Sequence, residues 1–323
     1  MIARSYAFAI AALSMLTALP NIVHSAENFP SAPLRLIAPF SPGSYADLTA
    51  RLVAEGMSTK LNVAVVVENR PGASSMIGTA AGARAEPDGY TITMVGSPAV
   101  MASKLTPNAK YDLARDFEYI GGVNDFYNVL VVNPKLGIRT FGEFKSYVKK
   151  NPGKFNLATS GEGAPSDIGG RQMAKVHGLD YTLVPYKGAT PVLTAVLSGE
   201  ADGAIMIAGL ATPHIKTNAL IALGLTAPQR LNTLPEVPDA NESGIRVITT
   251  GWTGLAAPTG TPASRIAVLN DALNAALKNE KVQKQFQDAG AATLGGTPRA
   301  LRDLVLQDLE SSEEVLKSLR SKK

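Results

Sequence analysis

Short apolar runs alternate with segments of helical periodicity along the chain after residue 33. Strands are expected where aliphatic and β-branched residues cluster, at 34–40, 63–67, 90–95, 128–132, 155–158, 181–185, 203–207, 219–225 and 253–257. Between these runs apolar residues recur every three or four positions, as they do in amphipathic helices. Helices are expected at 46–60, 76–84, 141–149, 167–176, 190–198, 262–277, 280–289 and 298–319. Strands that alternate with helices form mostly parallel sheets flanked by helices, so the pattern predicts an α/β fold.

The alternation forms two series, which predicts two lobes. The C-terminal helices need a sheet to pack on, and the N-terminal series is their natural partner. The chain would then cross between lobes at 121–127 and return at 249–254, so we expect residues 27–124 and 252–323 in lobe 1 and residues 125–251 in lobe 2. Two crossings make a hinge, with the ends of strands from both lobes facing a shared ligand cleft that can close.

Two loops of small residues stand at equivalent places in the two series, each between a strand and a helix. The first spans 39–47 (PFSPGSYAD) and the second spans 158–167 (ATSGEGAPSD). Glycine-rich backbone followed by a helix N-terminus can bind an anion such as a carboxylate. Tight turns before helices are also ordinary in α/β folds, but one such loop in each lobe favours ligand binding more than either loop alone.

A third segment, 184–188 (VPYKG), follows another strand of the second series. Tyr186 and Lys187 are expected near the rim of the cleft, where Lys187 would attract acids. A solvated surface lysine is the alternative interpretation, because most lysines are exposed.

The N-terminus has the pattern of a secretory signal peptide over residues 1–26. Arg4 precedes an apolar run at 7–19, and Pro20 and small residues at Ser25 and Ala26 follow. The run is shorter than the roughly 20 residues of a membrane span. No cysteine follows it for a lipid anchor, so we expect a mature protein free in the periplasm.

Composition excludes several kinds of protein. The 31 basic and 27 acidic residues are scattered and leave a net charge of +4, with no basic stripe for nucleic acid. Cysteine is absent and only three histidines occur, without metal-ligand spacing or a nucleophile motif. We therefore expect no metal, no cofactor, no nucleic-acid partner and no enzymatic activity.

Five segments together resemble the Bug-type receptors, the extracytoplasmic binding proteins of tripartite tricarboxylate transporters. They are 33–40 with Asp47 and Arg51, then 65–73, 86–90, 184–188 and 234–238. The resemblance implies a two-lobed periplasmic binding protein fold of type II-like form. It also implies a monomeric receptor that captures a small organic carboxylate, mostly through backbone amides and ordered water, and delivers it by hinge closure to the permease subunits of the membrane transporter.

Four positions depart from the family pattern. Ser41 and Ser44 stand where the first loop usually has proline and glycine, and Tyr45 adds a ring beside the site. Asp167 stands where the second loop usually has histidine. Asp167 either accepts a hydrogen bond from an amine or hydroxyl of the ligand or points away as a helix cap.

The expected site is built from both loops and the third segment. The candidate ligand-binding residues are Ser41, Gly43, Ser44, Tyr45, Asp47, Thr159, Ser160, Gly161, Gly163, Ser166, Asp167, Tyr186 and Lys187. A sensor subunit that presents its liganded form to a membrane signalling protein is the alternative to a transport receptor.

Overall fold

The computed structural model describes residues 29–106, 109–288 and 291–320. The predicted signal peptide, 1–26, lies outside these residues. The strands are β1 (Leu34–Ala38), β2 (Val65–Asn69), β3 (Thr91–Gly96), β4 (Phe117–Val132), β5 (Asn156–Thr159), β6 (Thr182–Pro185), β7 (Gly203–Ile207), β8 (Ile221–Leu225), β9 (Thr250–Pro258) and β10 (Ala291–Gly295). The helices are α2 (Tyr45–Leu61), α3 (Met76–Ala83), α4 (Ser97–Leu105), η1 (Pro134–Leu136), α5 (Phe141–Lys150), α6 (Pro165–His177), α7 (Ala189–Ser198), α8 (Ala208–Lys216), α9 (Ala263–Leu277), α10 (Glu280–Asp288) and α11 (Pro298–Arg320).

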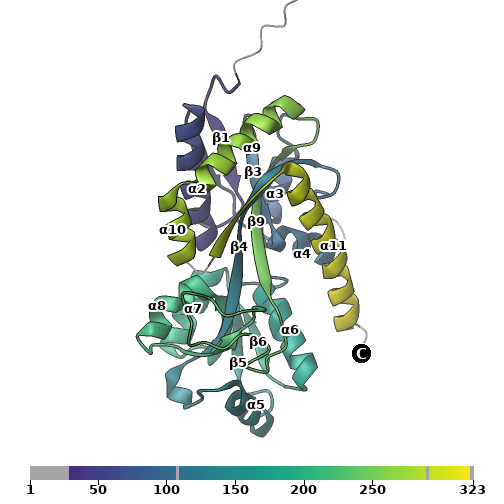
Figure 1. Cartoon of the computed structure of the whole chain (residues 1–323). Coiled ribbons are helices and arrows are strands. Elements are labelled where there is room, and N and C mark those ends of the chain that lie inside the picture. Colours follow the sequence, from purple (N-terminus) through teal and green to yellow (C-terminus); the bar gives the residue numbers. More distant parts are fainter. Residues whose placement is uncertain (1–28, 107–108, 289–290, 321–323) are drawn as a thin grey trace, which may run out of the picture.

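The strands form two sheet regions that share β4, in the order β2-β1-β3-β9-β4-β7-β5-β6, with β8 and β10 also paired to β4. The first part of β4 pairs with β9 and β10, and Asn128–Val132 pairs with β7 and β8. Lobe 1 is the sheet region of β1, β2, β3, β9 and β10 with helices α2–α4 and α9–α11, and lobe 2 is the sheet region of β5–β8 with α5–α8. β4 and β9 run along the axis that joins the lobes (Figure 1).

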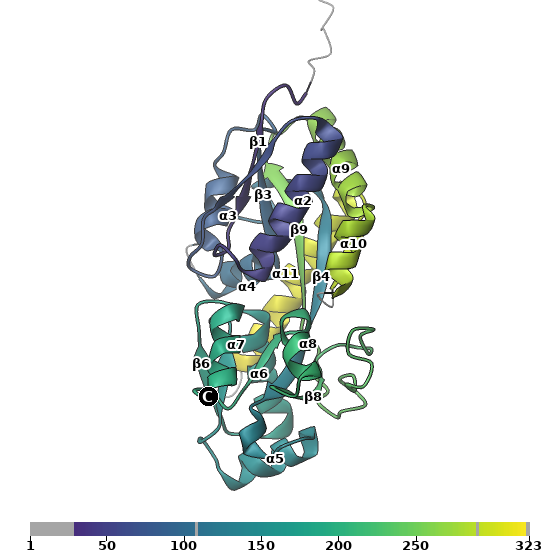
Figure 2. The same ribbon diagram turned by 90° about the vertical axis from the view of Figure 1, so that its left-hand side faces the viewer.

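Each lobe has an apolar core of its own. In lobe 1 the face of the sheet packs Leu36 and Ile92 against Leu269 and Leu273 of α9. In lobe 2 the aromatic rings of Phe141, Phe144 and Phe155 lie under one face of the sheet, and α7 and α8 cover the other face. A side view shows α2, α9 and α10 on lobe 1 and α5–α8 on lobe 2 (Figure 2).

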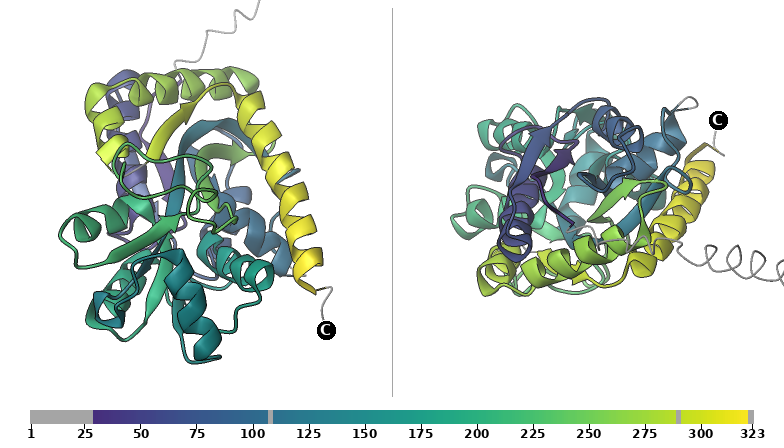
Figure 3. Two further views of the ribbon diagram at one scale, coloured as in Figure 1. Left: turned by 60° about the horizontal axis from the view of Figure 1, so that its bottom comes forward. Right: turned by 90° about the horizontal axis from the view of Figure 1, so that it is seen from above.

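The C-terminal helix α11 reaches beyond lobe 1. It lies along one side of the molecule in both views of Figure 3. Near its end Leu316 joins a small apolar cluster with Met101 of α4 and Ile168 of α6. Lys104 of α4 forms an ion pair with Glu313 at 3.2 Å, so α4, α6 and α11 meet beside the second loop.

The predicted crossings are strands and not linkers. The expected strand at 128–132 is the second half of the 16-residue β4, and the pairing of β4 with β9 is antiparallel, whereas the outer strands of both lobes are parallel. Gly121, Gly122, Asn124 and Asp125 gave this region a turn-like composition, although 13 of the 16 positions of β4 are buried. The boundaries at 124/125 and 251/252 fall inside β4 and β9, and that division stays a prediction.

Candidate functional site

The first loop connects β1 to α2 through a tight turn. The Ser44 amide donates to the Ser41 carbonyl at 3.1 Å, and Gly43, the third residue of the turn, has a φ of +74°. A type II turn requires this left-handed conformation at that position, and glycine adopts it without steric cost. Ser44 caps the helix by accepting a hydrogen bond from the Asp47 amide at 3.3 Å.

Asp47 holds this loop from behind. Its Oδ2 accepts the Gly43 amide at 2.8 Å and Arg51 Nε at 3.1 Å, and its Oδ1 accepts Asn69 Nδ2 at 2.7 Å. Burial by itself would raise the pKa of the Asp47 carboxyl, but the hydrogen bonds from Asn69, Gly43 and Arg51 outweigh burial and keep that pKa below its ordinary value. Asp47 is therefore an ionised support for the loop, and its carboxylate is already occupied.

The second loop repeats this arrangement between β5 and α6. The Ala164 amide donates to the Gly161 carbonyl at 3.2 Å, and Gly163 has a φ of +75°. Asp167 Oδ2 accepts the Gly163 amide and Arg171 Nε, each at 3.0 Å. The spacing of glycine, aspartate and arginine, four residues apart in both loops, thus builds the same frame twice.

A cleft of about 950 Å³ lies where the two loops meet the ends of the central strands. The first loop, the second loop and the start of α7 contribute to its lining, together with Phe126 and Asn128 of β4, Ile205–Ile207 of β7 and Thr253 of β9. Both loops point the N-terminus of a helix of 13 or more residues toward this space.

The structure brings nine of the thirteen predicted residues to the cleft. These are Ser41, Gly43, Ser44, Tyr45, Ser160, Gly161, Ser166, Tyr186 and Lys187. Asp47, Thr159, Gly163 and Asp167 do not line it. Asp47 and Asp167 are each 2% exposed. Of the two roles considered for Asp167, the geometry favours the one in which the side chain points away from the ligand, where it accepts the Gly163 amide and Arg171 Nε.

Tyr45 projects from the first loop toward β4. Its hydroxyl accepts a hydrogen bond from Asn124 Nδ2 at 3.1 Å, and its ring meets Phe126 edge to face with centroids 6.2 Å apart. Burial raises the pKa of the Tyr45 hydroxyl well above its ordinary value, so Tyr45 is a neutral phenol. The ring that departs from the family pattern therefore forms part of the cleft wall and is fixed in place by β4.

A third loop, Pro71–Ser75 between β2 and α3, also lines the cleft. Ala73, Ser74 and Ser75 have φ values of +47°, +51° and +72°, a left-handed run that is uncommon for residues with a side chain. The Ser74 hydroxyl donates to the Glu162 carbonyl of the second loop at 3.1 Å, which joins the two lobes. Sequence reasoning used this segment only for family resemblance, although its small residues between a strand and a helix are the signal that drew attention to the other two loops.

Sequence reasoning also missed the side of the cleft that β4 and β9 form. Asn128 of β4 and Thr253 of β9 line the cleft. Both were expected in strands, Thr253 also at the return crossing, but neither was among the predicted ligand-binding residues. Their signal in the sequence is weak, because a polar residue within an apolar strand is as often a structural partner as a ligand contact.

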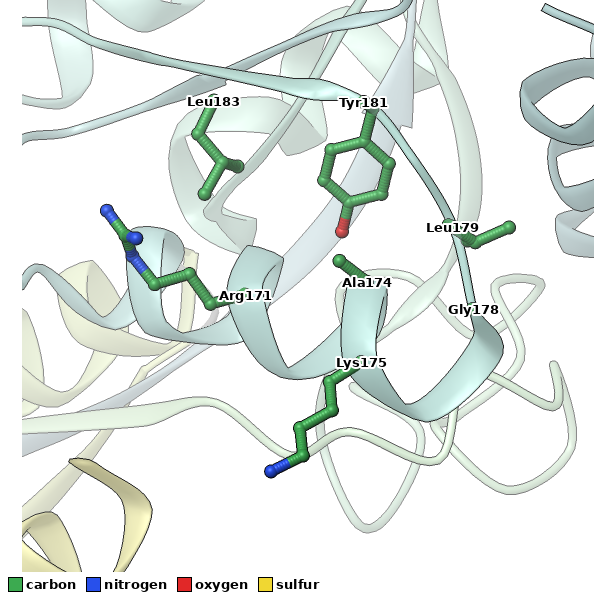
Figure 4. A pocket seen from close by; sticks show the side chains of 7 residues that line it. All are labelled: Arg171, Ala174, Lys175, Gly178, Leu179, Tyr181 and Leu183. Carbon is green, nitrogen blue, oxygen red and sulfur yellow. The ribbon is translucent and has the colours of Figure 1, made fainter. Parts of the chain in front are cut away.

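A smaller hollow, of about 460 Å³, lies on the outside of lobe 2 between α6 and the segment that leads into β6. Figure 4 shows its lining by Arg171, Ala174, Lys175, Gly178, Leu179, Tyr181 and Leu183. Arg171 is already paired with Asp167, and the Tyr181 hydroxyl donates to the Gly170 carbonyl. These groups stabilise α6, and the larger cleft is the candidate ligand site.

The described residues contain neither a metal-binding cluster nor a helix that could cross a membrane. Within residues 29–106, 109–288 and 291–320, no three His, Cys, Asp or Glu side chains form a group that could hold a metal ion. Among the helices of the same residues, none has the length and apolar character needed to cross a membrane.

Two α/β lobes joined by shared strands, with loops and helix N-termini facing one cleft, define a solute-binding protein. The family model described as "Tripartite tricarboxylate transporter family receptor" matches residues 49–320, and the chain belongs to this family. The Bug-type resemblance is therefore confirmed, and the family consists of solute-binding receptors and not of enzymes, as predicted.

Two relatives span nearly the whole chain. A protein of Agrobacterium vitis is 34% identical over 95% of this chain and 90% of its own length. The protein BugT of Bordetella pertussis is 30% identical over 92% of both chains.

Three solved structures have the same fold. The periplasmic binding protein BugD is 33% identical, with a TM-score of 0.84 over 90% of this chain and 98% of its own. MatC of Rhodopseudomonas palustris, solved with malate, is 29% identical with a TM-score of 0.83 over 89% and 99%. A second R. palustris protein, solved with adipate, is 26% identical with a TM-score of 0.85 over 90% and 98%. The predicted α/β fold of a periplasmic binding protein is confirmed by these matches.

Proposed function

We propose that this protein is a periplasmic receptor that captures a small organic carboxylate and delivers it to the membrane subunits of a tripartite tricarboxylate transporter. The observation that carries the proposal is the pair of equivalent loops facing one cleft. The two R. palustris neighbours that were solved with malate and adipate are both bound to carboxylates, which supports this ligand class.

The donors for the carboxylate come from both lobes. The amides of Gly43 and Gly163 are used by Asp47 and Asp167, so the ligand is left with the first-turn amides, which have no acceptor within the helix. Tyr45, Ala46 and Ser166 supply such amides at the cleft. The Ser44 hydroxyl adds a donor, and the Ser160 and Ser166 hydroxyls together add one more, because one of them donates to the other at 3.0 Å. The two helix dipoles favour a negative charge.

Binding is proposed to close the lobes about β4 and β9, with residues 27–124 and 252–323 moving against 125–251. The hydrogen bond from Ser74 to the Glu162 carbonyl supports a closed arrangement, because its partners come from different lobes. Lys187, exposed at the rim, would attract the acid before closure. The closed monomer would present the surface that the transporter recognises.

A thermal-shift screen of ligand-stripped mature protein against small acids and their amides tests the ligand class. A ligand at one hundred times its Kd stabilises the folded state by about 2.7 kcal/mol, which is a measurable shift. Ser160→Phe should abolish the response by filling the cleft, and Ser146→Phe, on an exposed turn of α5, is the matched control. A response to sugars or amines but to no acid would overturn the proposal.

A sensor subunit for a membrane signalling protein is the alternative function. The same cleft would serve either role, so the distinction lies in the partner. A pull-down from periplasm-facing membranes, with and without the acid identified by the screen, separates the two: enrichment of permease subunits supports transport, and enrichment of a signalling protein contradicts it.

A further inference from the structure

Two asparagines, Asn124 and Asn128, lie on the same face of β4, four residues apart, and their side-chain amides have different hydrogen-bond partners. Asn124 donates from Nδ2 to the Tyr45 hydroxyl at 3.1 Å, and its Oδ1 accepts the Thr253 hydroxyl. Asn128 donates from Nδ2 to the Thr249 carbonyl and to Thr249 Oγ1, both at 3.1 Å. Both ends of the Asn124 amide are therefore occupied, while only the nitrogen end of Asn128 is.

The orientation of the Asn128 amide follows from its partners. A backbone carbonyl can only accept, so the group that faces the Thr249 carbonyl must be the NH₂. Two threonine hydroxyls support this orientation. Thr226 Oγ1 donates to the Asn128 backbone carbonyl at 3.1 Å and also shares a hydrogen bond with Thr249 Oγ1. Thr249 therefore donates to Thr226 and accepts from Asn128, and a flipped amide would break the chain of hydrogen bonds.

The Asn128 Oδ1 atom is left as an acceptor at the floor of the cleft. Asn128 is only 2% exposed, yet it lines the cleft. Its Oδ1 accepts no hydrogen bond within the described part of the chain. Among the described residues, the side-chain oxygens that are both fully buried and without a partner are those of Thr93, Thr159 and Thr233. The Asn128 Oδ1 is not one of them, so it is accessible from the cleft. An acceptor fixed in this way has to be matched by a donor, because an unpaired polar group costs free energy when a ligand expels water.

We propose that Asn128 is a specificity-determining residue whose Oδ1 accepts a hydrogen bond from a hydroxyl group of the ligand, so that the receptor selects hydroxy acids over the same acids without the hydroxyl. This inference rests on the proposed carboxylate-binding function. A carboxylate is repelled by a carbonyl oxygen, so the acid group lies at the loops and the hydroxyl points to β4. An ammonium is disfavoured because no Asp or Glu is among the residues that line the cleft, and a buried charge needs a partner.

Matched pairs of acids that differ by one hydroxyl test the proposal: malate and succinate, citrate and tricarballylate, lactate and propionate, mandelate and phenylacetate. The Kd of each is measured by calorimetry on the ligand-stripped mature protein. In every pair that binds, we expect the hydroxy acid to bind about tenfold or more tightly. Equal affinities, or a preference for an amino analogue such as aspartate over malate, would overturn the proposal while leaving carboxylate capture intact.

Asn128→Ala should reduce the preference within each pair to less than about threefold. Thr249→Val is the matched control, because it removes one partner of the Asn128 NH₂ without lining the cleft, and it should keep the preference. The ratio is measured within one protein, so a change in fold stability cancels. A preference that survives Asn128→Ala overturns the assignment, and if that variant does not fold, the wild-type pairs still decide the outcome. Binding of no acid at all overturns both the inference and the proposed function.

Discussion

The two loops of the cleft share a frame and differ in what they present. In each, a left-handed glycine donates its amide to an aspartate four residues later, and that aspartate accepts an arginine Nε four residues further on. The positions between them differ: Ser44, Tyr45 and Ala46 in lobe 1 stand opposite Ala164, Pro165 and Ser166 in lobe 2. The comparison indicates that the frame fixes the shape of each loop, whereas the intervening residues, all of which line the cleft, differ between the lobes.

The frames are not supported equally. Asp47 has a third partner, Asn69 at the end of β2, which also donates to the Phe40 carbonyl at 3.1 Å. Among the described residues Asp167 has no third partner equivalent to Asn69. Its loop instead packs against α4 of the other lobe, where Met101 and Ile168 belong to one apolar cluster. The first frame is therefore self-contained within lobe 1, whereas the second depends on contacts between the lobes.

Replacing the aspartates should have the largest effect. Asp47→Asn leaves three donors without a carboxylate and should lower the free energy of unfolding by about 2 to 4 kcal/mol, against about 1 to 3 kcal/mol for Asp167→Asn. Arg51 and Arg171 are about half exposed, so their ion pairs with the aspartates contribute little to stability. Most of the loss in each variant should come from the buried glycine amide that the aspartate accepts. Urea unfolding measures both values, with Asp271→Asn, a surface residue of α9, as the control. Equal losses would show that Asn69 adds nothing and that the frames are equivalent.

Replacing the glycines should have the opposite order of effect: the loss of stability should be larger in the second loop than in the first. Alanine at either position costs about 1 to 2 kcal/mol for its left-handed conformation. A Cβ at Gly43 has nothing within 4 Å, but at Gly163 it would lie 2.3 Å from Leu105 Cδ1 of α4. We therefore expect Gly163→Ala to destabilise by about 1 kcal/mol more, and to weaken binding of the acid found in the screen more than Gly43→Ala does.

The double variant Gly163→Ala with Leu105→Ala is the control for this prediction. Removing the Leu105 side chain relieves the clash and should bring the affinity back toward that of Leu105→Ala alone. A loss of affinity that is the same with and without Leu105 would contradict an effect of contact between the lobes.

Periodicity predicted most outer strands and helices because local pattern determines them. In the site, the loop residues between a strand and a helix were predicted from composition. The role of Asp167 was left open, because residue types alone do not show whether its carboxylate faces the ligand or accepts the Gly163 amide and Arg171 Nε. The role of Asn128 was missed because β4 pairs with strands that are distant in sequence, and no local signal encodes such pairing. Asn128 pairs with Ile207, 79 residues away, and Asp125 pairs with Ala292, 167 residues away. Helices α4 and α8 were missed because they are short, with nine residues each and a proline in both.

The frame of lobe 1 should also give a pH signature. Because the pKa of Asp47 is lowered by folding, its contribution to stability is fully present above the unfolded pKa of about 3.9 and is lost as pH falls through the lower folded value. The difference in unfolding free energy between wild type and Asp47→Asn should therefore be constant above about pH 5 and shrink below about pH 4. Other carboxyls, including Asp308, whose pKa burial raises, titrate in both proteins and cancel. A difference independent of pH in urea unfolding would contradict an ionised Asp47.

The smallest effect concerns the contact that joins the loops across the cleft. Ser74→Ala removes one hydrogen bond, to the Glu162 carbonyl, and a neutral hydrogen bond contributes about 0.5 to 1.5 kcal/mol. If that bond forms only when the lobes close, its loss should appear as a roughly three- to tenfold faster release of the bound acid, with little change in the stability of the unliganded protein. Ser146→Ala is the matched control, since its hydroxyl donates to the Gly142 carbonyl at 3.0 Å within an exposed helix of lobe 2 and leaves the cleft untouched. Stopped-flow fluorescence or absorbance measures the rate of release. If Ser74→Ala instead lowers the stability of the unliganded protein by the full value of the hydrogen bond, the lobes are already joined without ligand. The second frame would then depend on lobe 1 at all times and not only when an acid is bound.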